Sequence, residues 1–310
     1  MTPDAALLWA AAAAGAVPAL REALRKPMTE EVRRAAPGAF VDLPKGRTHY
    51  CWLGRQRGPI AVCVHGLTTP SFVWRGLARQ LASLGFRVLI YDLYGRGYSD
   101  RPKEANTPAY FVKQLHDLLA ALDVDGDITL FGYSMGGVIA SGFAAKYPNM
   151  LRRLVLIAPA GMQTDLGRTA KFATEWPVVG DWVFHMAYPS VLKRGYRAER
   201  EVAKSVERLE EMQLAELTYR GYLRSVLSSL RYTLRHPIPA IHKQVALNGV
   251  PVAAIWGRDD TVIPIAGLGQ LAQWNRKAHQ EVIEGAGHGL VYTHTDELGD
   301  MIARLTGLRA

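Results

Sequence analysis

The chain has 310 residues, 49% of them hydrophobic, which excludes a disordered polymer and allows one large core with an insertion. Its formal net charge of +9 is spread along the sequence without zinc-finger spacing or an RNP-type aromatic stretch, so we expect no nucleic-acid binding. The two cysteines, Cys51 and Cys63, form no CxxC pair and exclude a disulfide framework or a thiol-based metal or redox site.

The first 40 residues form an N-terminal segment that is apolar and then basic. Its apolar run, residues 5–20, is shorter than the ~20 residues that span a bilayer and is interrupted by Pro18. Asp4 stands where a secretory signal carries basic residues. Three interpretations stay open: a helix packed on the domain or on an oligomer partner, a monotopic or short membrane anchor, and a removed signal. We expect a cytoplasmic protein, either free or in peripheral membrane contact through this segment, and leave its oligomeric state open.

Short runs rich in Val, Ile and Leu then alternate with longer helical patterns. Helices are predicted at residues 71–84, 110–122 and 135–147. This alternation is typical of an α/β protein with a mainly parallel central sheet and helices on both faces. The predicted strands are residues 49–53, 60–64, 86–91, 127–131, 153–158, 251–256 and 279–283.

One long gap interrupts this alternation. Between residues 158 and 251 no clear β run appears, and the segment is too long for a loop. Its patterns are helical, for example over residues 198–217, where Val202, Val206, Leu209 and Met212 recur at helical spacing. We therefore predict a helical cap at 160–245, inserted into a core made of residues 41–159 and 246–310.

The sequence GYSMGG at residues 132–137 lies directly after one predicted strand and directly before a helix. A strand-to-helix turn is the context in which a GxSxG pattern has a catalytic mechanism. Gly132 and Gly136 allow the sharp turn to close, which exposes the hydroxyl of Ser134. The backbone N–H of Met135, at the start of the helix, then faces a developing oxyanion. The alternative is a Gly-rich turn with an idle serine.

A serine nucleophile needs a base, and a carboxylate that orients the base. Among nine histidines, His288 follows the last predicted strand in a Gly-rich loop, where its ring reaches over the sheet edge. Asp259 and Asp260 follow another strand; their side chains diverge, so only one faces His288, and we favour Asp260. A solvated loop histidine and a turn or helix-capping aspartate are the alternatives. The chain order Ser134, Asp260, His288 is the order expected of α/β hydrolases.

Together these motifs resemble the α/β-hydrolase family from about residue 40 to 305. The motifs are HGLT at 65–68, DLYGRGYS at 92–99, the Ser134 turn, GRDD at 257–260 and GH at 287–288. The resemblance implies an α/β-hydrolase fold, Asp260 as the triad acid, and an oxyanion hole made by the backbone N–H groups of Leu67 and Met135. It also implies that His65 shapes the loop that carries Leu67.

Related dehalogenases and epoxide hydrolases carry an aspartate where this chain has Ser134, so the resemblance indicates acyl transfer. We expect a serine esterase or lipase that cleaves a small-molecule ester, with a short to medium acyl group or a monoacylglycerol-like lipid, through an acyl-enzyme. The turn, cap and apolar N-terminal segment look like monoacylglycerol-lipase-type esterases. Neither a metal nor an organic cofactor is expected. A carbon–carbon bond hydrolase, a perhydrolase and a ligand-binding protein with little turnover are the alternatives.

The predicted cap also carries a group of aromatic side chains. They either line an acyl pocket or pack in the cap's own core, and core packing is the default for such residues. The group consists of Phe172, Trp176, Trp182, Phe184 and Tyr188.

Overall fold

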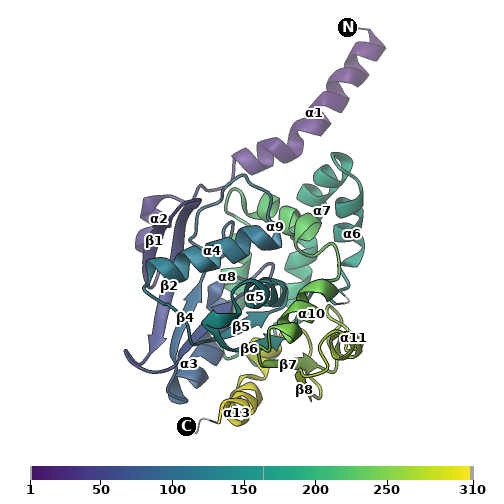
Figure 1. Ribbon diagram of the computed structural model, residues 1–310. Coiled ribbons are helices and arrows are strands. Elements are labelled where there is room, and N and C mark those ends of the chain that lie inside the picture. Colours follow the sequence, from purple (N-terminus) through teal and green to yellow (C-terminus); the bar gives the residue numbers. More distant parts are fainter. Residues whose placement is uncertain (1, 163, 308–310) are drawn as a thin grey trace.

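The computed structural model describes residues 2–162 and 164–307, which form one eight-stranded sheet covered by helices (Figure 1). The strand order is β1-β2-β4-β3-β5-β6-β7-β8. Neighbours from β4 to β8 pair in parallel, whereas β1 with β2 and β2 with β4 pair antiparallel, so the predicted mainly parallel sheet is confirmed. The strands are β1 (Ala39–Leu43), β2 (Gly46–Gly54), β3 (Ile60–Val64), β4 (Arg87–Tyr91), β5 (Ile128–Tyr133), β6 (Leu151–Ile157), β7 (Val252–Gly257) and β8 (His279–Ile283).

Helices cover both faces of this sheet, as predicted. Helices α4, α5, α10 and α11 contribute to the core on one face, and α3, α12 and α13 to the core on the other. The helical segments are α1 (Pro3–Ala23), α2 (Glu30–Arg34), η1 (Ser71–Trp74), α3 (Arg75–Ser83), α4 (Pro108–Ala121), α5 (Met135–Lys146), η2 (Pro148–Met150), α6 (Gly167–Glu175), α7 (Val179–Ala198), α8 (Leu209–Glu216), α9 (Tyr222–Tyr232), α10 (Pro239–Leu247), α11 (Ala266–Trp274), α12 (Leu290–Thr293) and α13 (Thr295–Thr306).

The central strands are apolar on both faces because both faces are covered. In β3, Val62 and Val64 lie in the core under α4 and α5, whereas Ala61 and Cys63 lie in the core under α3 and α13. Successive side chains of a strand point to opposite faces, so a strand buried on both sides reads as one continuous apolar run.

The edge strand β1 was not among the predicted strands. Within the described part of the chain it pairs with β2 alone, and Asp42 on it is exposed. A short edge strand with one face toward solvent carries a weak apolar pattern, and its pairing with β2 is decided by the tertiary structure.

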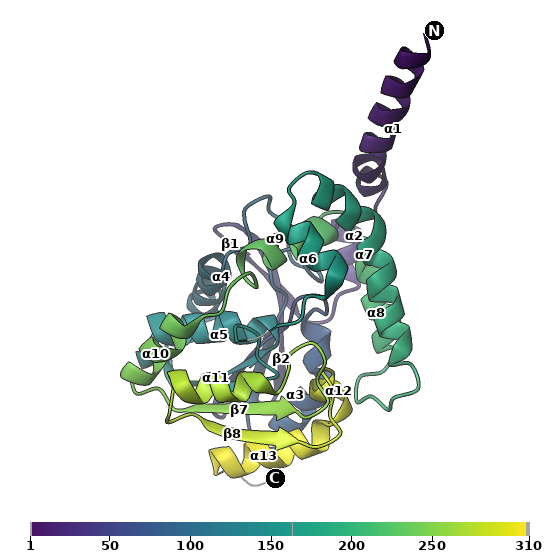
Figure 2. The same cartoon turned by 90° about the vertical axis from the view of Figure 1, so that its right-hand side faces the viewer.

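Between β6 and β7 the described residues form helices α6 to α10 and no strand. Helices α6, α7 and α9 share a separate apolar core that includes Phe184, Tyr188 and Tyr222. Helix α10 instead packs against α5 and α11 beside the sheet, so the predicted cap boundary at residue 245 falls within α10. Figure 2 shows α6, α7 and α9 above the sheet and α10 at its flank. We call the segment from α6 to α9 the cap.

The helix predicted over residues 198–217 is wrong in its first half. Helix α7 ends at Ala198, and only α8 continues the helical pattern. Between them, the amino group of Lys204 donates to the carbonyls of Glu199, Arg200 and Val202, replacing helical N–H donors. Val206 is buried in the core beside α3 and α12 rather than in the cap. Leu209 and Met212 of α8 pack in the same core, and Val202 is exposed, so the apolar spacing reflects one core but not one continuous helix.

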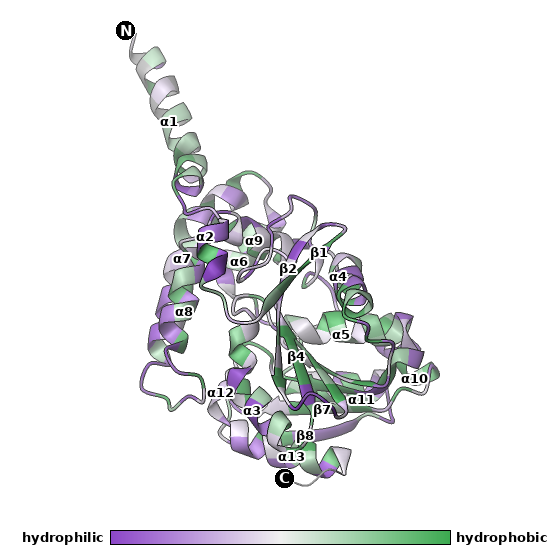
Figure 3. Cartoon of the chain, turned by 90° about the vertical axis from the view of Figure 1, so that its left-hand side faces the viewer, coloured by the Kyte–Doolittle hydropathy of each residue, from purple (hydrophilic) through white to green (hydrophobic). Residues whose placement is uncertain are grey.

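Helix α1 projects away from the body, at the end opposite the C-terminus (Figures 1 and 2). The second half of α1 and the residues after it contact the cap: the indole N–H of Trp182 donates to the carbonyl of Ala14 at 2.9 Å, and Lys26, three residues beyond the helix, pairs with Tyr219 in a short parallel bridge. Apolar residues run along most of its length (Figure 3). Among the described residues, no helix is long and apolar enough to cross a bilayer.

Candidate active site

The turn from β5 to α5 holds Ser134 in a conformation that L-residues rarely adopt, with φ of 54° and ψ of −122°. Its N–H donates to the carbonyl of Ile157, and its own carbonyl accepts from Gly137 and Ala160. The turn is tightly enclosed. A Cβ at Gly132 would lie 2.6 Å from the carbonyl oxygen of Gly136, so glycine is the residue that fits.

Ser134, His288 and Asp260 lie in one hydrogen-bonded line. The Oγ of Ser134 is 3.0 Å from Nε2 of His288, and Nδ1 of His288 is 2.8 Å from Oδ2 of Asp260. The carboxylate can only accept, so Nδ1 carries the proton and Nε2 is free to accept from the serine hydroxyl. This arrangement gives the imidazole the tautomer that a general base requires.

The two adjacent aspartates differ sharply in burial. The side chain of Asp260 is 1% exposed, and its second oxygen accepts from the backbone N–H groups of Val262 and Ile263, both at 2.8 Å. Asp259 is exposed to solvent. Three donors therefore stabilise the Asp260 carboxylate and fix its orientation toward His288.

Two tyrosines that the sequence analysis did not single out support the histidine loop. The hydroxyl of Tyr133 donates to the carbonyl of His288 at 2.9 Å, and the two rings are stacked with centroids 5.3 Å apart. The hydroxyl of Tyr292, in α12, donates to Glu199 at the end of α7. Tyr133 stands between Gly132 and Ser134, where the motif allows any residue, so its role became visible only in three dimensions.

The two backbone N–H groups expected to form an oxyanion hole belong to Leu67 and Met135. Within the described chain, neither donates to a protein acceptor. His65 fixes the loop before Leu67: its Nδ1–H donates to the carbonyl of Gly66, and its Nε2 accepts from the N–H of Leu93. Burial lowers the pKa of His65 to about 4, so the ring is neutral at pH 7 and serves as both donor and acceptor.

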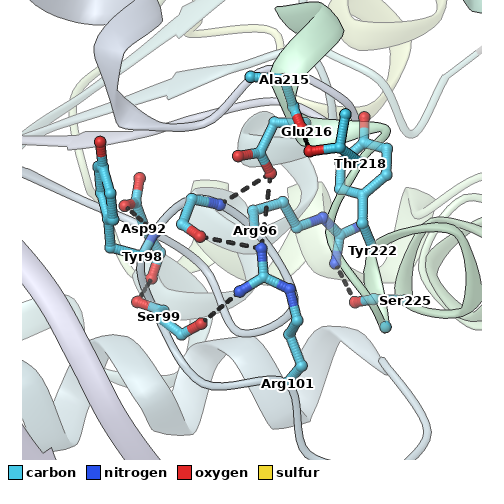
Figure 4. Close-up of polar contacts among 12 residues, drawn as sticks. Asp92, Arg96, Tyr98, Ser99, Arg101, Ala215, Glu216, Thr218, Tyr222 and Ser225 are labelled. Carbon is cyan, nitrogen blue, oxygen red and sulfur yellow. Dashed lines mark hydrogen bonds and ion pairs between the residues drawn. The ribbon is translucent and has the colours of Figure 1, made fainter. Parts of the chain in front are cut away.

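A buried arginine, whose contact with Ser225 is drawn in Figure 4, links the same loop to the cap. The guanidinium of Arg96 donates to the carbonyl of Leu67 at 3.1 Å and to the hydroxyls of Ser225 and Ser229 in α9 at 2.7 and 2.8 Å. Burial lowers the pKa of Arg96 to about 10, and the group stays charged at pH 7. The position of the Leu67 peptide is thus coupled to the cap helix above it.

A second polar contact joins cap helix α8 to the core beside Arg96. Glu216, at the end of α8, accepts a hydrogen bond from the N–H of Gly97 at 3.0 Å and lies 3.8 Å from the guanidinium of Arg101. Arg101 also donates to the carbonyls of Gly97 and Ser99, as Figure 4 shows. Burial raises the pKa of Glu216 to about 7 despite these partners.

A buried ion pair between His49 and Asp92 holds the 92–99 loop, which carries Arg96 and Gly97. Asp92 accepts from the N–H groups of Ser71 and Tyr98, and from Nδ1 of His49 at 2.7 Å. Burial opposes ionisation of both side chains, but the pair keeps the pKa of Asp92 well below its usual range and raises the pKa of His49. Because Nε2 of His49 contacts the carbonyl of Pro37, both ring nitrogens act as donors and the ring is cationic.

A cavity of about 490 Å³ lies between Ser134 and the cap. Its wall is mainly apolar, and it contains the carboxylates of Asp165 and Glu199; among the described lining residues there is neither Lys nor Arg. The apolar lining includes Leu67, Ala160, Leu166, Leu192, Leu230, Leu234 and Val262.

The cap aromatics divide into three groups. Tyr188 lines the cavity and also packs in the cap core, and Phe184 packs in that core alone. Phe172, Trp176 and Trp182 are exposed, so the default expectation of core packing is wrong for these three. Helical periodicity does not distinguish a side chain buried in the cap from one on its outer surface.

Comparison with known proteins agrees with this fold. A family model described as the α/β hydrolase fold matches residues 59–295, and the chain therefore belongs to this family of enzymes. It is 20% identical to a 2-hydroxy-6-oxo-6-(2'-aminophenyl)hexa-2,4-dienoic acid hydrolase of Metapseudomonas resinovorans, over 91% of this chain and 96% of that protein. It is 25% identical to Lipase 1 of Psychrobacter immobilis, over 81% and 78%. The solved structure of a bacterial membrane phospholipase A is 21% identical, with a TM-score of 0.69 over 98% of this chain and 97% of that one.

The tight packing around the β5–α5 turn predicts that one added methyl group strongly lowers stability. In Gly136→Ala the new Cβ would meet the carbonyl oxygens of Val64 and His65, so the free energy of unfolding should fall by about 2–3 kcal/mol. Urea unfolding measures this change. Gly269→Ala, in α11, is the matched control: its Cβ would meet no atom within 4 Å, and the substitution should stabilise by about 0.5–1 kcal/mol. Equal effects of the two substitutions would contradict the enclosed geometry.

Glu216 predicts a specific dependence of stability on pH. Its pKa is about 7 in the folded chain against 4.5 for the free side chain, so the folded state binds the proton more tightly. The free energy of unfolding should therefore fall as the pH rises from 4.5 to about 7. Relative to Glu216→Gln, which cannot ionise, the wild type should lose up to about 3 kcal/mol between pH 4.5 and 7. Urea unfolding of both proteins across this range measures the difference, and parallel curves would contradict it.

Proposed function

We propose that the chain is a serine hydrolase that cleaves uncharged carboxylic esters, with a medium acyl chain held in the cavity under the cap. The observation that carries this proposal is the line from Ser134 through His288 to Asp260, which opens onto a mainly apolar cavity without a cation among its described residues. A hydroxyl activated in this way attacks carbonyl carbon, and an apolar cavity favours an acyl chain over a charged group.

In the proposed reaction, the Oγ of Ser134 attacks the ester carbonyl while Nε2 of His288 takes its proton. The tetrahedral intermediate collapses as His288 returns that proton to the leaving alkoxide, which departs as an alcohol. Water then attacks the acyl-serine with His288 again as base, releasing the acid and restoring Ser134. Asp260 remains ionised throughout and stabilises the imidazolium.

The negative charge of each tetrahedral intermediate falls on the former carbonyl oxygen. We assign its stabilisation to the N–H groups of Leu67 and Met135, which have no acceptor in the described chain. Losing one such donor in a comparable site costs about 3–4 kcal/mol of transition-state stabilisation. The neutral His65 and the charged Arg96 hold the Leu67 peptide from its two sides and thus position one donor.

Carbon–carbon bond cleavage is the main competing activity, because one relative carries that substrate in its name. The dienoic acid of the Metapseudomonas enzyme bears a carboxylate. In this chain, the same substrate would place its anion in a cavity that holds Asp165 and Glu199 and whose described residues include no cation. Burial of an unpaired charge is strongly unfavourable, so the wall composition favours a neutral ester, as does the likeness to Lipase 1.

The roles of the two aspartates are tested by matched substitutions. Asp260→Asn should lower kcat for 4-nitrophenyl butyrate by about 10⁴-fold, because the amide favours the wrong imidazole tautomer. Asp259→Asn should keep most activity, since its side chain faces solvent. Ser134→Ala should abolish both turnover and labelling by a fluorophosphonate. Labelling without turnover of any ester in a chain-length series would contradict the esterase assignment, and equal losses in the two aspartate variants would contradict the role of Asp260.

The charge of the cavity predicts discrimination between two esters of similar length. Mono-4-nitrophenyl succinate, with a terminal carboxylate, should have a kcat/KM at least about tenfold below that of 4-nitrophenyl butyrate. Glu199→Gln should narrow this ratio because it removes one of the two carboxylates in the wall. A preference for the anionic ester would instead favour an acidic substrate of the carbon–carbon hydrolase type.

A further inference from the structure

The turn between α6 and α7 exposes an unusual group of large apolar side chains. Trp176 is 59% exposed, Val178 79% and Val179 58%, with Phe172 and Trp182 beside them at 38% each. The rings of Phe172 and Trp176 stack on each other, with centroids 6.3 Å apart. Scattered exposed apolar residues are normal, but a contiguous aromatic group on the surface marks a contact site.

Helix α1 extends this apolar surface. Trp182 donates to the carbonyl of Ala14, and Arg21 contacts the sulfur of Met186 in α7 at 3.5 Å, so α1 and α7 lie side by side at this end of the molecule. Leu7 and Trp9 are each 70% exposed, and Leu20 and Leu24 are similarly open to solvent. We call the α6–α7 turn together with α1 the cap apex. Figures 2 and 3 show it as the end of the molecule farthest from β8 and α13.

The charges of α6 and α7 are strongly one-sided. Five exposed cations lie on these two helices, and none pairs with a carboxylate among the described residues. The helices carry two acidic residues, and one of them, Asp181, is paired with Arg231 of α9. Arg168 and Lys171 lie on α6, roughly 8–12 Å along the helix from Trp176, whereas the three cations of α7 lie near its C-terminal end, ~20 Å or more from Val179. An apolar turn with unpaired cations on the helix beside it is complementary to an anionic lipid bilayer. The five cations are Arg168, Lys171, Lys193, Arg194 and Arg197.

The same helices border the candidate active-site cavity. Leu166 and Gly167, at the start of α6, and Leu192 and Gly195 of α7 lie in its wall. Leu192 lies ~20 Å along α7 from Val179, so these two helices connect the cap apex to the cavity wall. We propose that the cap apex docks on an anionic bilayer and that the ester substrate is a lipid taken from it, an inference that rests on the proposed function for its substrate.

A second copy of the chain is the alternative occupant, and the charge distribution disfavours it. In a two-fold symmetric contact through the α6–α7 turn the same patch meets itself, so the unpaired Arg168 and Lys171 would lie near those of the other copy. Like charges across an interface are repulsive, whereas phosphate headgroups neutralise them. The aromatic rings also suit the membrane interface, where tryptophan is enriched.

Vesicle flotation tests the docking independently of catalysis. The full chain carrying Ser134→Ala is mixed with vesicles of equimolar phosphatidylcholine and phosphatidylglycerol, and with phosphatidylcholine alone. It should float with the anionic vesicles and much less with the neutral ones. Trp176→Glu with Val179→Glu should lower the partition coefficient by at least about tenfold, because two apolar side chains lose their burial. Arg168→Glu with Lys171→Glu, on α6 beside the turn, should lower it for anionic vesicles in particular.

Matched controls lie outside the cap apex. Leu247→Glu changes an 81% exposed leucine at the end of α10, and Arg55→Glu with Arg57→Glu changes exposed cations in the β2–β3 loop; both should float like the parent. In the Ser134 background, the apex variants should hydrolyse 4-nitrophenyl butyrate normally but lose at least about tenfold in the turnover of a lipid ester within the vesicles.

Two results would overturn the docking proposal. One is flotation of the Trp176 and Val179 variant equal to that of the parent. The other is a parent that does not float but forms a dimer in lipid-free gel filtration, with the dimer lost in the apex variants, which would assign the surface to a second copy. Normal flotation with no turnover of any ester would leave the docking intact and remove the proposed function instead.

Discussion

The sharp turn at Ser134 is the constraint on which the site depends. Strand β5 lies at the centre of the sheet between β3 and β6, and the turn ends it in a backbone conformation that aims one hydroxyl away from the strand. Strands β3, β7 and β8 run parallel to β5, so the loops that follow them begin at the same edge of the sheet as the Ser134 turn. They deliver Leu67, Asp260 and His288 to that hydroxyl, so residues distant in sequence meet in one line.

The cap is joined to this arrangement by two buried ionisable side chains as well as by apolar contacts. Arg96 connects the Leu67 carbonyl to two serines of α9, and Glu216 connects α8 to the loop at Gly97. Burying an ionisable side chain costs free energy of folding unless its hydrogen bonds are satisfied. The partners of Arg96 and Glu216 lie within reach only when the cap is docked on the core as observed. A displacement of the cap would therefore break these bonds and shift a proposed oxyanion donor. The cap thus forms part of the cavity wall and also supports the geometry of the candidate site.

Charge is distributed differently inside and outside the cap. The cavity wall holds carboxylates and, among its described residues, no cation, whereas the outer faces of α6 and α7 carry unpaired cations. The carboxylates in the cavity disfavour binding of an anionic substrate. The cations on the outside favour contact with an anionic surface. A neutral ester presented by an anionic lipid surface satisfies both, which is why we join the proposed activity and the proposed docking surface in one account.

The sequence by itself determined the α/β class, most strands, and the residues that meet at the site, because these depend on local patterns. Buried strands are continuous apolar runs, and a GxSxG turn, an Asp and a His each follow a strand whose end must lie at one edge. Only the tertiary structure decided which of two adjacent aspartates is buried, that residues 199–208 leave the helical pattern, and that Phe172, Trp176 and Trp182 face outward. The hydrogen bonds by which Arg96 and Glu216 join core and cap could not be predicted either, since these partners lie more than a hundred residues away in the sequence. Burial and long-range pairing depend on how the cap sits on the sheet, and no local spacing encodes that.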